Sequence, residues 1–366
     1  MKKLLHIILI SFLCLLNCSR ESPSLRILQL DGTPYERGYK HGHTLRLEIR
    51  DILNKWRQTI ENQHQFSFDS LKAQFLRETN YQSAIEKWTP DVLQEVRGLA
   101  NGAGIDFDTM YFFQISEEFE NYAAYTRHKC TAIGVHKTES QPTLLAQNMD
   151  PPNFLHGHPT VLHISDSTGL QSFVFTAPGL IGLNGMNNHS VGVTCNALPS
   201  KSIKWTGLPV TFIVRGLLQK TTSDDAIEFI KEIEHAGGQN YIIGGVNKAR
   251  CFECSTLDVK EFVPAETKNL TYHTNHYLVE TEPQYCSRLL SLQNEIKERD
   301  YIVDVNDIKS ILSQNKWNRG RPICNPFTYG SLIMILCESP ELLIAPGMPD
   351  RTPYQRLVFE NISPGS

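Results

Sequence analysis

Cys130 opens an apolar, β-type segment at residues 130–136, and Asp150 stands just after the next such segment, residues 143–148. If the peptide bond between Lys129 and Cys130 is cut, Cys130 carries both a thiol and a free α-amino group. An α-amine with a pKa of about 7.7–8.0 can accept the proton of a thiol whose pKa is about 8.5. The pattern therefore predicts a nucleophile and its general base at a new chain terminus. In an uncut chain, Cys130 would be an ordinary strand residue.

The composition is typical of a globular protein with a sizeable core. The chain has 366 residues, of which 40% are hydrophobic and 20% are charged. The formal net charge is −4, and no block of lysine and arginine interrupts the sequence. Nothing in this charge pattern indicates binding to nucleic acid or to an anionic membrane surface.

The N-terminal segment has the pattern of an export signal. Two lysines follow Met1, residues 4–16 are almost wholly apolar, and polar residues follow Cys18. The apolar run is too short to span a bilayer, and its end resembles a bacterial lipobox, although Asn17 departs from the usual small residue. We expect residues 1–17 to be a signal peptide and Cys18 to be lipidated. This predicts an exported lipoprotein of the periplasm or cell envelope that meets the membrane only through its lipid. A plain secretory signal cut nearby is the alternative.

The cysteines favour a free thiol over a metal site. Nine are present, and seven remain after the two of the export signal, an odd number that is consistent with one functional thiol. Cys251 and Cys254 have a CxxC spacing, but their surroundings indicate a strand, on which positions i and i+3 face opposite sides. His156 and His158 are expected to lie in a loop that lines the mouth of the site. We therefore predict no metal and no cofactor.

The periodicity predicts one α+β domain with layered sheets. Helices are expected before Cys130 at residues 34–65, 68–77, 90–103 and 106–125, and a short edge strand within residues 19–33. Strands are expected at residues 130–136, 143–148, 160–165, 172–177, 191–196, 241–246, 250–255, 261–263, 270–273, 331–337 and 342–345. Further helices are expected at residues 210–219, 223–236, 284–297 and 306–314.

Seven motifs, taken in order, carry one resemblance. They occupy residues 37–42, 95–104, 130–132, 147–150, 178–187, 191–198 and 274–278. Together they resemble the penicillin acyltransferase family (acyl-coenzyme A:6-aminopenicillanic acid acyltransferase), whose members are self-cleaving N-terminal-nucleophile (Ntn) cysteine hydrolases. The resemblance implies a four-layer αββα sandwich. It also implies a mostly helical α-chain at residues 19–129 and a β-chain at residues 130–366, which together form one structural domain.

The resemblance also implies the residues of the site. Cys130 matches the cysteine that self-cleavage frees, so that Lys129 and Cys130 flank the cut. Asp150 matches the aspartate near the new amino terminus, Asn275 the oxyanion-hole asparagine, and Arg288 an active-site arginine. This chain departs from the family pattern at Lys129, where a small residue is usual. It also departs at Met149, where an aromatic residue is usual, and this points to a different substrate pocket.

The implied function is an exported, autoproteolytic cysteine amidohydrolase or acyltransferase. It would cleave a linear amide, or transfer its acyl group, through a thioester on Cys130, with a small-molecule amide or acyl donor as its only partner. The chain has no nucleotide-type glycine loop, and export separates it from coenzyme A, which favours hydrolysis. Two alternatives remain: an uncut lipoprotein that only binds ligands, suggested by Lys129, and an uncut thiol protease that uses Cys130 with a histidine such as His273.

Overall fold

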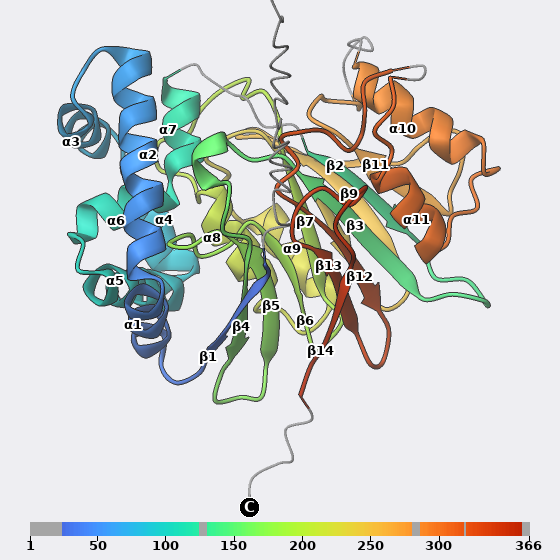
Figure 1. Ribbon diagram of the computed structural model, residues 1–366, viewed down its shortest axis with the longest axis horizontal. Coiled ribbons are helices and arrows are strands. Elements are labelled where there is room, and N and C mark those ends of the chain that lie inside the picture. The colour runs from blue at the N-terminus through green and yellow to red at the C-terminus, as the bar shows by residue number, and fades with distance from the viewer. Residues whose placement is uncertain (1–23, 124–129, 280–285, 318–319, 361–366) are drawn as a thin grey trace, which may run out of the picture.

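Two stacked β-sheets with helices on both outer sides make up the protein (Figure 1). The computed structural model describes residues 24–123, 130–279, 286–317 and 320–360. Within these ranges, an eight-stranded sheet has the order β1-β4-β5-β6-β7-β8-β9-β10, and a six-stranded sheet has the order β11-β2-β3-β12-β13-β14. Neighbouring strands are antiparallel except for β1 and β4, which are parallel.

The strands have the following bounds. The eight-stranded sheet contains β1 (Arg26–Leu30), β4 (Thr160–Ser165), β5 (Gln171–Thr176), β6 (Asn184–Asn187), β7 (Gly192–Ala197), β8 (Gln239–Gly244), β9 (Ala249–Cys254) and β10 (Val259–Phe262). The six-stranded sheet contains β11 (Leu270–His273), β2 (Thr131–Val135), β3 (Thr143–Met149), β12 (Gly330–Leu336), β13 (Glu341–Ala345) and β14 (Gln355–Val358).

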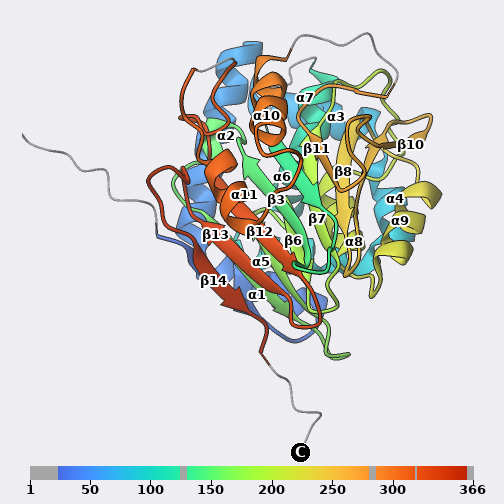
Figure 2. The ribbon, with the colours of Figure 1, turned by 90° about the vertical axis from the view of Figure 1, so that its right-hand side faces the viewer.

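Helices fill the two outer layers. Those that precede Cys130 are α1 (Pro34–Thr44), α2 (Arg46–His64), α3 (Phe68–Glu78), α4 (Tyr81–Trp88), α5 (Pro90–Ala103), α6 (Phe107–Gln114) and α7 (Ser116–Tyr122). With α8 (Val210–Leu217) and α9 (Ser223–Glu232) they lie on the side of the eight-stranded sheet. On the other side, α10 (Ser287–Lys297) and α11 (Val305–Leu312) lie in front of the six-stranded sheet, as Figure 2 shows. No helix in the described ranges has the length and apolar character needed to cross a membrane.

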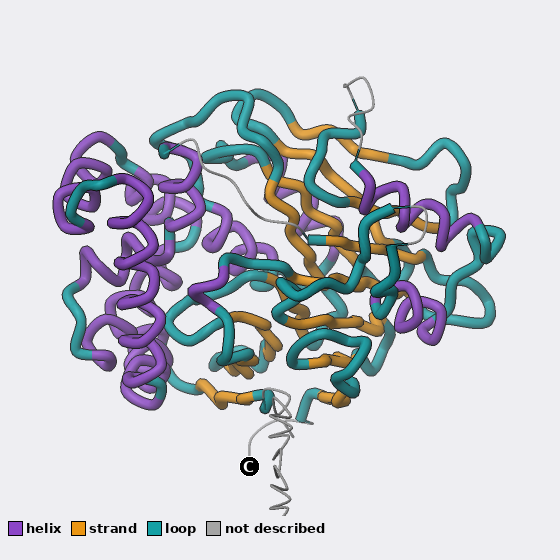
Figure 3. The backbone as a smooth tube through the Cα atoms, turned by 45° about the horizontal axis from the view of Figure 1, so that its top comes forward, coloured by secondary structure: helices purple, strands orange, loops and turns teal. Residues whose placement is uncertain are grey.

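Two apolar clusters join these layers. The larger one runs from helices α2 to α9 through the eight-stranded sheet to the inner face of the six-stranded sheet. The smaller one lies between the outer face of the six-stranded sheet and helices α10 and α11. Strands β2 and β3 pack directly against β7 and β8, so the order of layers is αββα (Figure 3). The predicted α+β class and four-layer sandwich are confirmed.

Glycines explain one of the sequence motifs, residues 37–42 together with 95–104. Helices α1 and α5 cross so closely that a Cβ added at Gly38 would lie 1.8 Å from the carbonyl oxygen of Glu95. A Cβ at Gly98 would lie 2.0 Å from the carbonyl oxygen of Tyr35. Only glycine permits this approach. The paired glycine motifs are therefore a packing device that joins the first helix to the fifth.

Most predicted elements are confirmed, with a few corrections. The helix expected at residues 34–65 is two helices, because Leu45 leaves the helical conformation with φ −108° and ψ 24°. The helix expected at residues 106–125 is likewise broken at Ile115, and residues 124–129 lie outside the described ranges. The helix expected at residues 223–236 ends at Glu232, since His235 pairs with Leu208 in a β-bridge. Helix α4 and strands β6 and β14 were not predicted.

Candidate active site

Strand pairing brings Cys130 and Asp150 to the same edge of the six-stranded sheet. Strands β2 and β3 are antiparallel neighbours, and Thr131 pairs with Asn148. Cys130 immediately precedes β2, and Asp150 immediately follows β3, so the start of one strand lies beside the end of the other. Both residues are buried. The register of a single strand pair thus places the thiol and the carboxylate at one location.

The environment of Cys130 keeps its thiol protonated in the intact chain. Burial, reinforced by the negative charge of Asp150, raises the pKa of the Cys130 thiol to about 12. A backbone hydrogen bond from Asp150 and the charge of Arg288 act in the opposite direction and only partly offset this effect. A buried thiolate is unfavourable because the charge loses its hydration. Attack by this sulfur therefore needs a base that removes the proton during the reaction.

Arg288 links two of the predicted site residues. Its Nη2 donates a hydrogen bond of 2.8 Å to Oδ1 of Asn275, and its Nη1 lies 3.7 Å from Oδ2 of Asp150. The side chains of Arg288 and Asp150 are 8% and 1% exposed, so this is a buried ion pair and not the usual surface one. Arg288 is the second residue of α10, which explains how a helix residue reaches the sheet edge.

The amide of Asn275 has a fixed orientation. Its oxygen accepts from Arg288, and its Nδ2 donates 2.9 Å to the carbonyl oxygen of Ala197 at the end of β7. If the amide were flipped, its nitrogen would face the Arg288 donor and its oxygen would face the carbonyl oxygen of Ala197, so both hydrogen bonds would be lost. An amide nitrogen carries two hydrogens, so the second can be donated to a substrate oxygen. This is the arrangement that an oxyanion-hole residue requires.

Asn325 is a site residue that the sequence did not reveal. Its Nδ2 donates a hydrogen bond of 2.7 Å to Oδ2 of Asp150. Asn325 is held in a tight turn by Thr328, and Tyr329 then donates its backbone N–H to the carbonyl oxygen of Met149. Asp150 is consequently oriented from two sides, by Asn325 and by Arg288. The available signal was the Asn-Pro pair shortly before strand β12, and that pair indicates only a turn.

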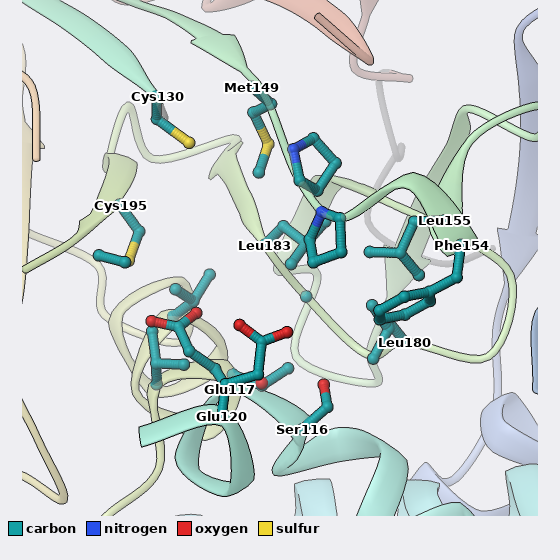
Figure 4. A pocket seen from close by; sticks show the side chains of 17 residues that line it. Ser116, Glu117, Glu120, Cys130, Met149, Phe154, Leu155, Leu180, Leu183 and Cys195 are labelled. Atoms are coloured by element: carbon teal, nitrogen blue, oxygen red, sulfur yellow. The ribbon is translucent and has the colours of Figure 1, made fainter. Parts of the chain in front are cut away.

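An open cavity with a volume of about 50 Å³ lies against the sulfur of Cys130 (Figure 4). Most of its wall is apolar, and the carboxyl groups of Glu117 and Glu120 enter from helix α7. The apolar lining consists of Met149, Pro151, Pro152, Phe154, Leu155, Leu180, Leu183, Ala197, Val210 and Val214. No lysine, arginine or histidine occurs among the described residues that line it. Such a wall suits an apolar acyl group, and its described residues include no histidine or lysine that could serve as the base.

A second cavity adjoins the first at Pro151 and Pro152. It has a volume of about 480 Å³ and an aromatic wall from Trp56, Phe119, Phe154 and Phe327. Both cavities share Glu120, Phe154 and the two prolines as lining. The two cavities therefore adjoin each other beside the Cys130 site.

The structure also places the residues that suggested a thiol protease or a metal site. Both ring nitrogens of His273 are engaged, Nε2 with Glu253 Oε1 and Nδ1 with the carbonyl oxygen of Thr274, each at 2.9 Å. Cys251 and Cys254 are buried free thiols on β9. His156 and His158 lie in or beside the loop after β3, and no group of three metal-ligating side chains occurs in the part of the chain that is described. Lys129 and Cys18 lie outside the described residues.

Comparison with known proteins agrees with the motif-based resemblance. The sequence profile of the acyl-coenzyme A:6-aminopenicillanic acid acyl-transferase family matches residues 136–316, a range that contains Asp150, Asn275 and Arg288. A protein of Emericella nidulans, the 40 kDa form of acyl-coenzyme A:6-aminopenicillanic-acid-acyltransferase, is 29% identical over 254 residues, which are 69% of each chain. Protein dcd1A of Dictyostelium discoideum is 25% identical over 236 residues, 55% of this chain and 51% of that protein.

Two solved structures also show similarity. A mutant conjugated bile acid hydrolase from Clostridium perfringens aligns with a TM-score of 0.39 and 12% identity, over 63% of this chain and 93% of that one. Penicillin V acylase from Agrobacterium tumefaciens aligns with a TM-score of 0.37 and 10% identity, over 63% and 87% of the two chains.

The sequence matches place this chain among proteins that are similar to acyl-transfer enzymes. Within that class, the chain resembles the penicillin acyltransferase family, and the resemblance that its motifs indicate is confirmed.

Proposed function

We propose that this protein is an exported, self-cleaving cysteine amidohydrolase or acyltransferase that works through a thioester on Cys130. The observation that carries the proposal is the convergence of four side chains on one sheet edge. Arg288 contacts both Asn275 and Asp150, and Asp150 stands beside Cys130, whose sulfur faces an apolar cavity. The residues come from separate elements, and their meeting is what a thiol acyl-transfer site needs.

The proposed reaction begins with the sulfur of Cys130 attacking the carbonyl carbon of a substrate amide. A sulfur–carbon bond forms, the thiol proton moves to the α-amine, and the carbonyl oxygen becomes an oxyanion that accepts the Asn275 N–H. The carbon–nitrogen bond then breaks, and the departing amine takes the proton from the α-ammonium group. Water, or an acceptor amine, finally attacks the thioester carbon and gives a proton to the α-amine; the sulfur–carbon bond breaks, the acid or new amide leaves, and the sulfur takes the proton to restore the thiol.

The free α-amine is the base that best fits this site. The Cys130 thiol, with its pKa raised to about 12, needs a nearby proton acceptor. The described lining of the cavity contains no histidine or lysine, and His273 has both nitrogens engaged elsewhere. Cutting the bond before Cys130 would create an amine within the nucleophile itself. These points favour the self-cleaving enzyme over an uncut thiol protease.

Hydrolysis of an amide with an apolar acyl group is the favoured reaction. The described walls of both cavities contain no lysine or arginine that could bind the phosphates of coenzyme A. Residues such as Leu180, Leu183 and Val214 would instead surround a hydrocarbon or aromatic acyl chain. Water is then the natural acceptor for an exported enzyme. The departing amine is expected to leave through the cavity mouth.

Intact-mass analysis of the purified protein tests the proposal. We expect two chains, the second beginning at Cys130, and we expect Cys130→Ala to remain a single inactive chain. Activity should be screened with acyl p-nitroanilides of increasing chain length and with lactams. A folded wild-type protein that stays uncut and hydrolyses none of these amides would overturn the proposed function, and would favour a binding lipoprotein.

The proposed lipid anchor on Cys18 is tested separately. In a bacterial host, the wild-type protein should partition into detergent and carry the added mass of a lipid at its first residue. Cys18→Ser should partition into the aqueous phase and still show the same cleavage at Cys130. Equal partitioning of both proteins would show that the chain is not anchored through this cysteine.

A further inference from the structure

A buried carboxylate, Glu253, joins the two sheets next to the loop that carries Asn275. Glu253 lies on β9 of the eight-stranded sheet, and its Oε1 contacts Nε2 of His273 at 2.9 Å, at the end of β11 of the six-stranded sheet. The two side chains are 3% and 0% exposed. Because this hydrogen-bonded pair is buried, it fixes the end of β11 against β9.

The hydrogen bonds determine how this pair is protonated. Nδ1 of His273 must carry a hydrogen, because its partner, the carbonyl oxygen of Thr274, can only accept. Nε2 faces an oxygen of Glu253, so one proton lies between these two atoms. A directional hydrogen bond therefore joins the two side chains.

Glu253 also accepts hydrogen bonds from the far end of the same loop. Its Oε1 accepts the backbone N–H of Leu278, and its Oε2 accepts that of Val279 at 3.3 Å. His273 meanwhile fixes the near end through the carbonyl oxygen of Thr274. The carboxylate of Glu253 thus holds both ends of the segment that contains Asn275, the near end through His273 and the far end directly. That segment is a turn without regular helix or strand hydrogen bonds to hold it.

We propose that Glu253, oriented by His273, is a positioning residue that holds the Asn275 loop in place for oxyanion stabilisation. The inference rests on the proposed acyl-transfer function and adds two residues to it. Glu253 acts only through the loop, whereas Asn275 is the residue that touches the substrate. Misplacing a catalytic group by about 1 Å can cost on the order of 10²-fold in rate, which sets the expected size of the effect.

A double-mutant cycle on the cut, full-length enzyme tests the inference. With an acyl p-nitroanilide that the wild type hydrolyses, Glu253→Gln should lower kcat by about 10- to 100-fold and change KM by less than about twofold. Cys130 should still react with iodoacetamide at the wild-type rate, which shows that the nucleophile remains intact. The double variant with Asn275→Ala should be no slower than Asn275→Ala alone, because Glu253 acts through Asn275.

Glu261→Gln is the matched control. Glu261 lies on the neighbouring strand β10 and forms a partly exposed pair with Arg250, so the same substitution should leave kcat within about twofold. His273→Gln serves as a second variant if Glu253→Gln does not fold, and it should lower kcat in the same way. An unchanged kcat in the folded variants, or effects of Glu253→Gln and Asn275→Ala that multiply, would overturn the inference.

Hydrogen exchange separates this inference from the proposed function. In uncut Cys130→Ala protein, adding Glu253→Gln should speed exchange of the amides of Leu278 and Val279, and adding Glu261→Gln should not. If the wild type hydrolyses no amide, the proposed function fails, and faster exchange would then reduce Glu253 to a structural residue. If the wild type is active and exchange is unchanged, only the positioning role is lost.

Discussion

The guanidinium group of Arg288 donates a hydrogen bond of 2.8 Å to the amide oxygen of Asn275, and thereby turns the amide nitrogen toward Ala197 and the site. Without Arg288, Asn275 could turn either the oxygen or the nitrogen of its amide toward Ala197. With Arg288 opposite, only the orientation that offers N–H groups is compatible with the hydrogen bonds. A neutral donor at this place stabilises an oxyanion without requiring a charge to be buried.

The first prediction concerns Asn275. Asn275→Ala should lower kcat by about 10²- to 10³-fold with little change in KM, since the lost contact forms only when the oxyanion develops. Steady-state kinetics on acyl p-nitroanilides, normalised to the fraction of chain that begins at Cys130, would measure this. Asn269→Ala, at an exposed position just before β11, is the control and should match the wild type. A large rise in KM at unchanged kcat would instead assign Asn275 to substrate binding.

The second prediction concerns the two chains after cleavage. They should remain together without a covalent link, because β1 pairs with β4 over five residues and Glu95 of α5 forms a bidentate pair with Arg215 of α8. Size-exclusion chromatography should give one species with the mass of both chains, and denaturing gels should give two bands. Separation in native buffer would mean that these contacts do not suffice to hold the α-chain.

The sequence predicts the architecture well where the apolar periodicity is strong. Strand β11 and helix α5 have the bounds that the pattern predicts. Strand β6 was missed because its sequence, Asn-Gly-Met-Asn, lacks the residues that favour strands. It is a strand because β5 and β7 pair with it from both sides, which is a tertiary effect that local sequence does not record.

Some contacts of the site can likewise be predicted from the sequence, and others cannot. Cys130 and Asp150 are near in sequence, and one strand pair unites them, so their meeting follows from the alternation of strands and turns. The bond from Asn325 to Asp150 spans 175 residues and depends on a turn that folds back to the sheet edge. Glu253 lies on a different sheet from the loop that it holds. Such contacts form only when the layers pack together, so the spacing of motifs along the chain cannot predict them.

The third prediction compares two bidentate arginine–glutamate pairs that differ in burial. In the uncut Cys130→Ala background, Arg215→Ala should lower the free energy of unfolding by about 3–5 kcal/mol, because it removes both hydrogen bonds to the buried carboxylate of Glu95 and leaves only Arg37, whose Nε lies 3.8 Å from Oε2. Arg250→Ala removes the partly exposed partner of Glu261 and should cost less than about 1 kcal/mol. Urea unfolding followed by circular dichroism would measure both. Similar losses in the two variants would show that burial does not set the strength of these pairs.

The fourth prediction concerns Glu118, a buried carboxyl group that accepts the backbone N–H of Val210 at the start of helix α8. Burial, helped by the charges of Glu117 and Glu120, raises the pKa of Glu118 from 4.5 to about 8. The folded protein therefore holds a proton that the unfolded chain releases above pH 4.5. The contribution of Glu118 to stability is greatest below that pH and declines as pH rises to about 8.

Glu118→Gln keeps the acceptor for Val210 and removes the ionisation, so it should abolish this decline. Between pH 5 and pH 7.5, in the Cys130→Ala background, the wild-type side chain should lose stability relative to the variant by about 1.4 kcal/mol per pH unit, on the order of 3 kcal/mol in all. Urea unfolding at both pH values measures the difference. Glu86→Gln, at an exposed position on α4, should show no such trend. A stability difference between the wild type and Glu118→Gln that is independent of pH would mean that Glu118 is ionised in the folded protein, with water or a cation reaching the start of α8.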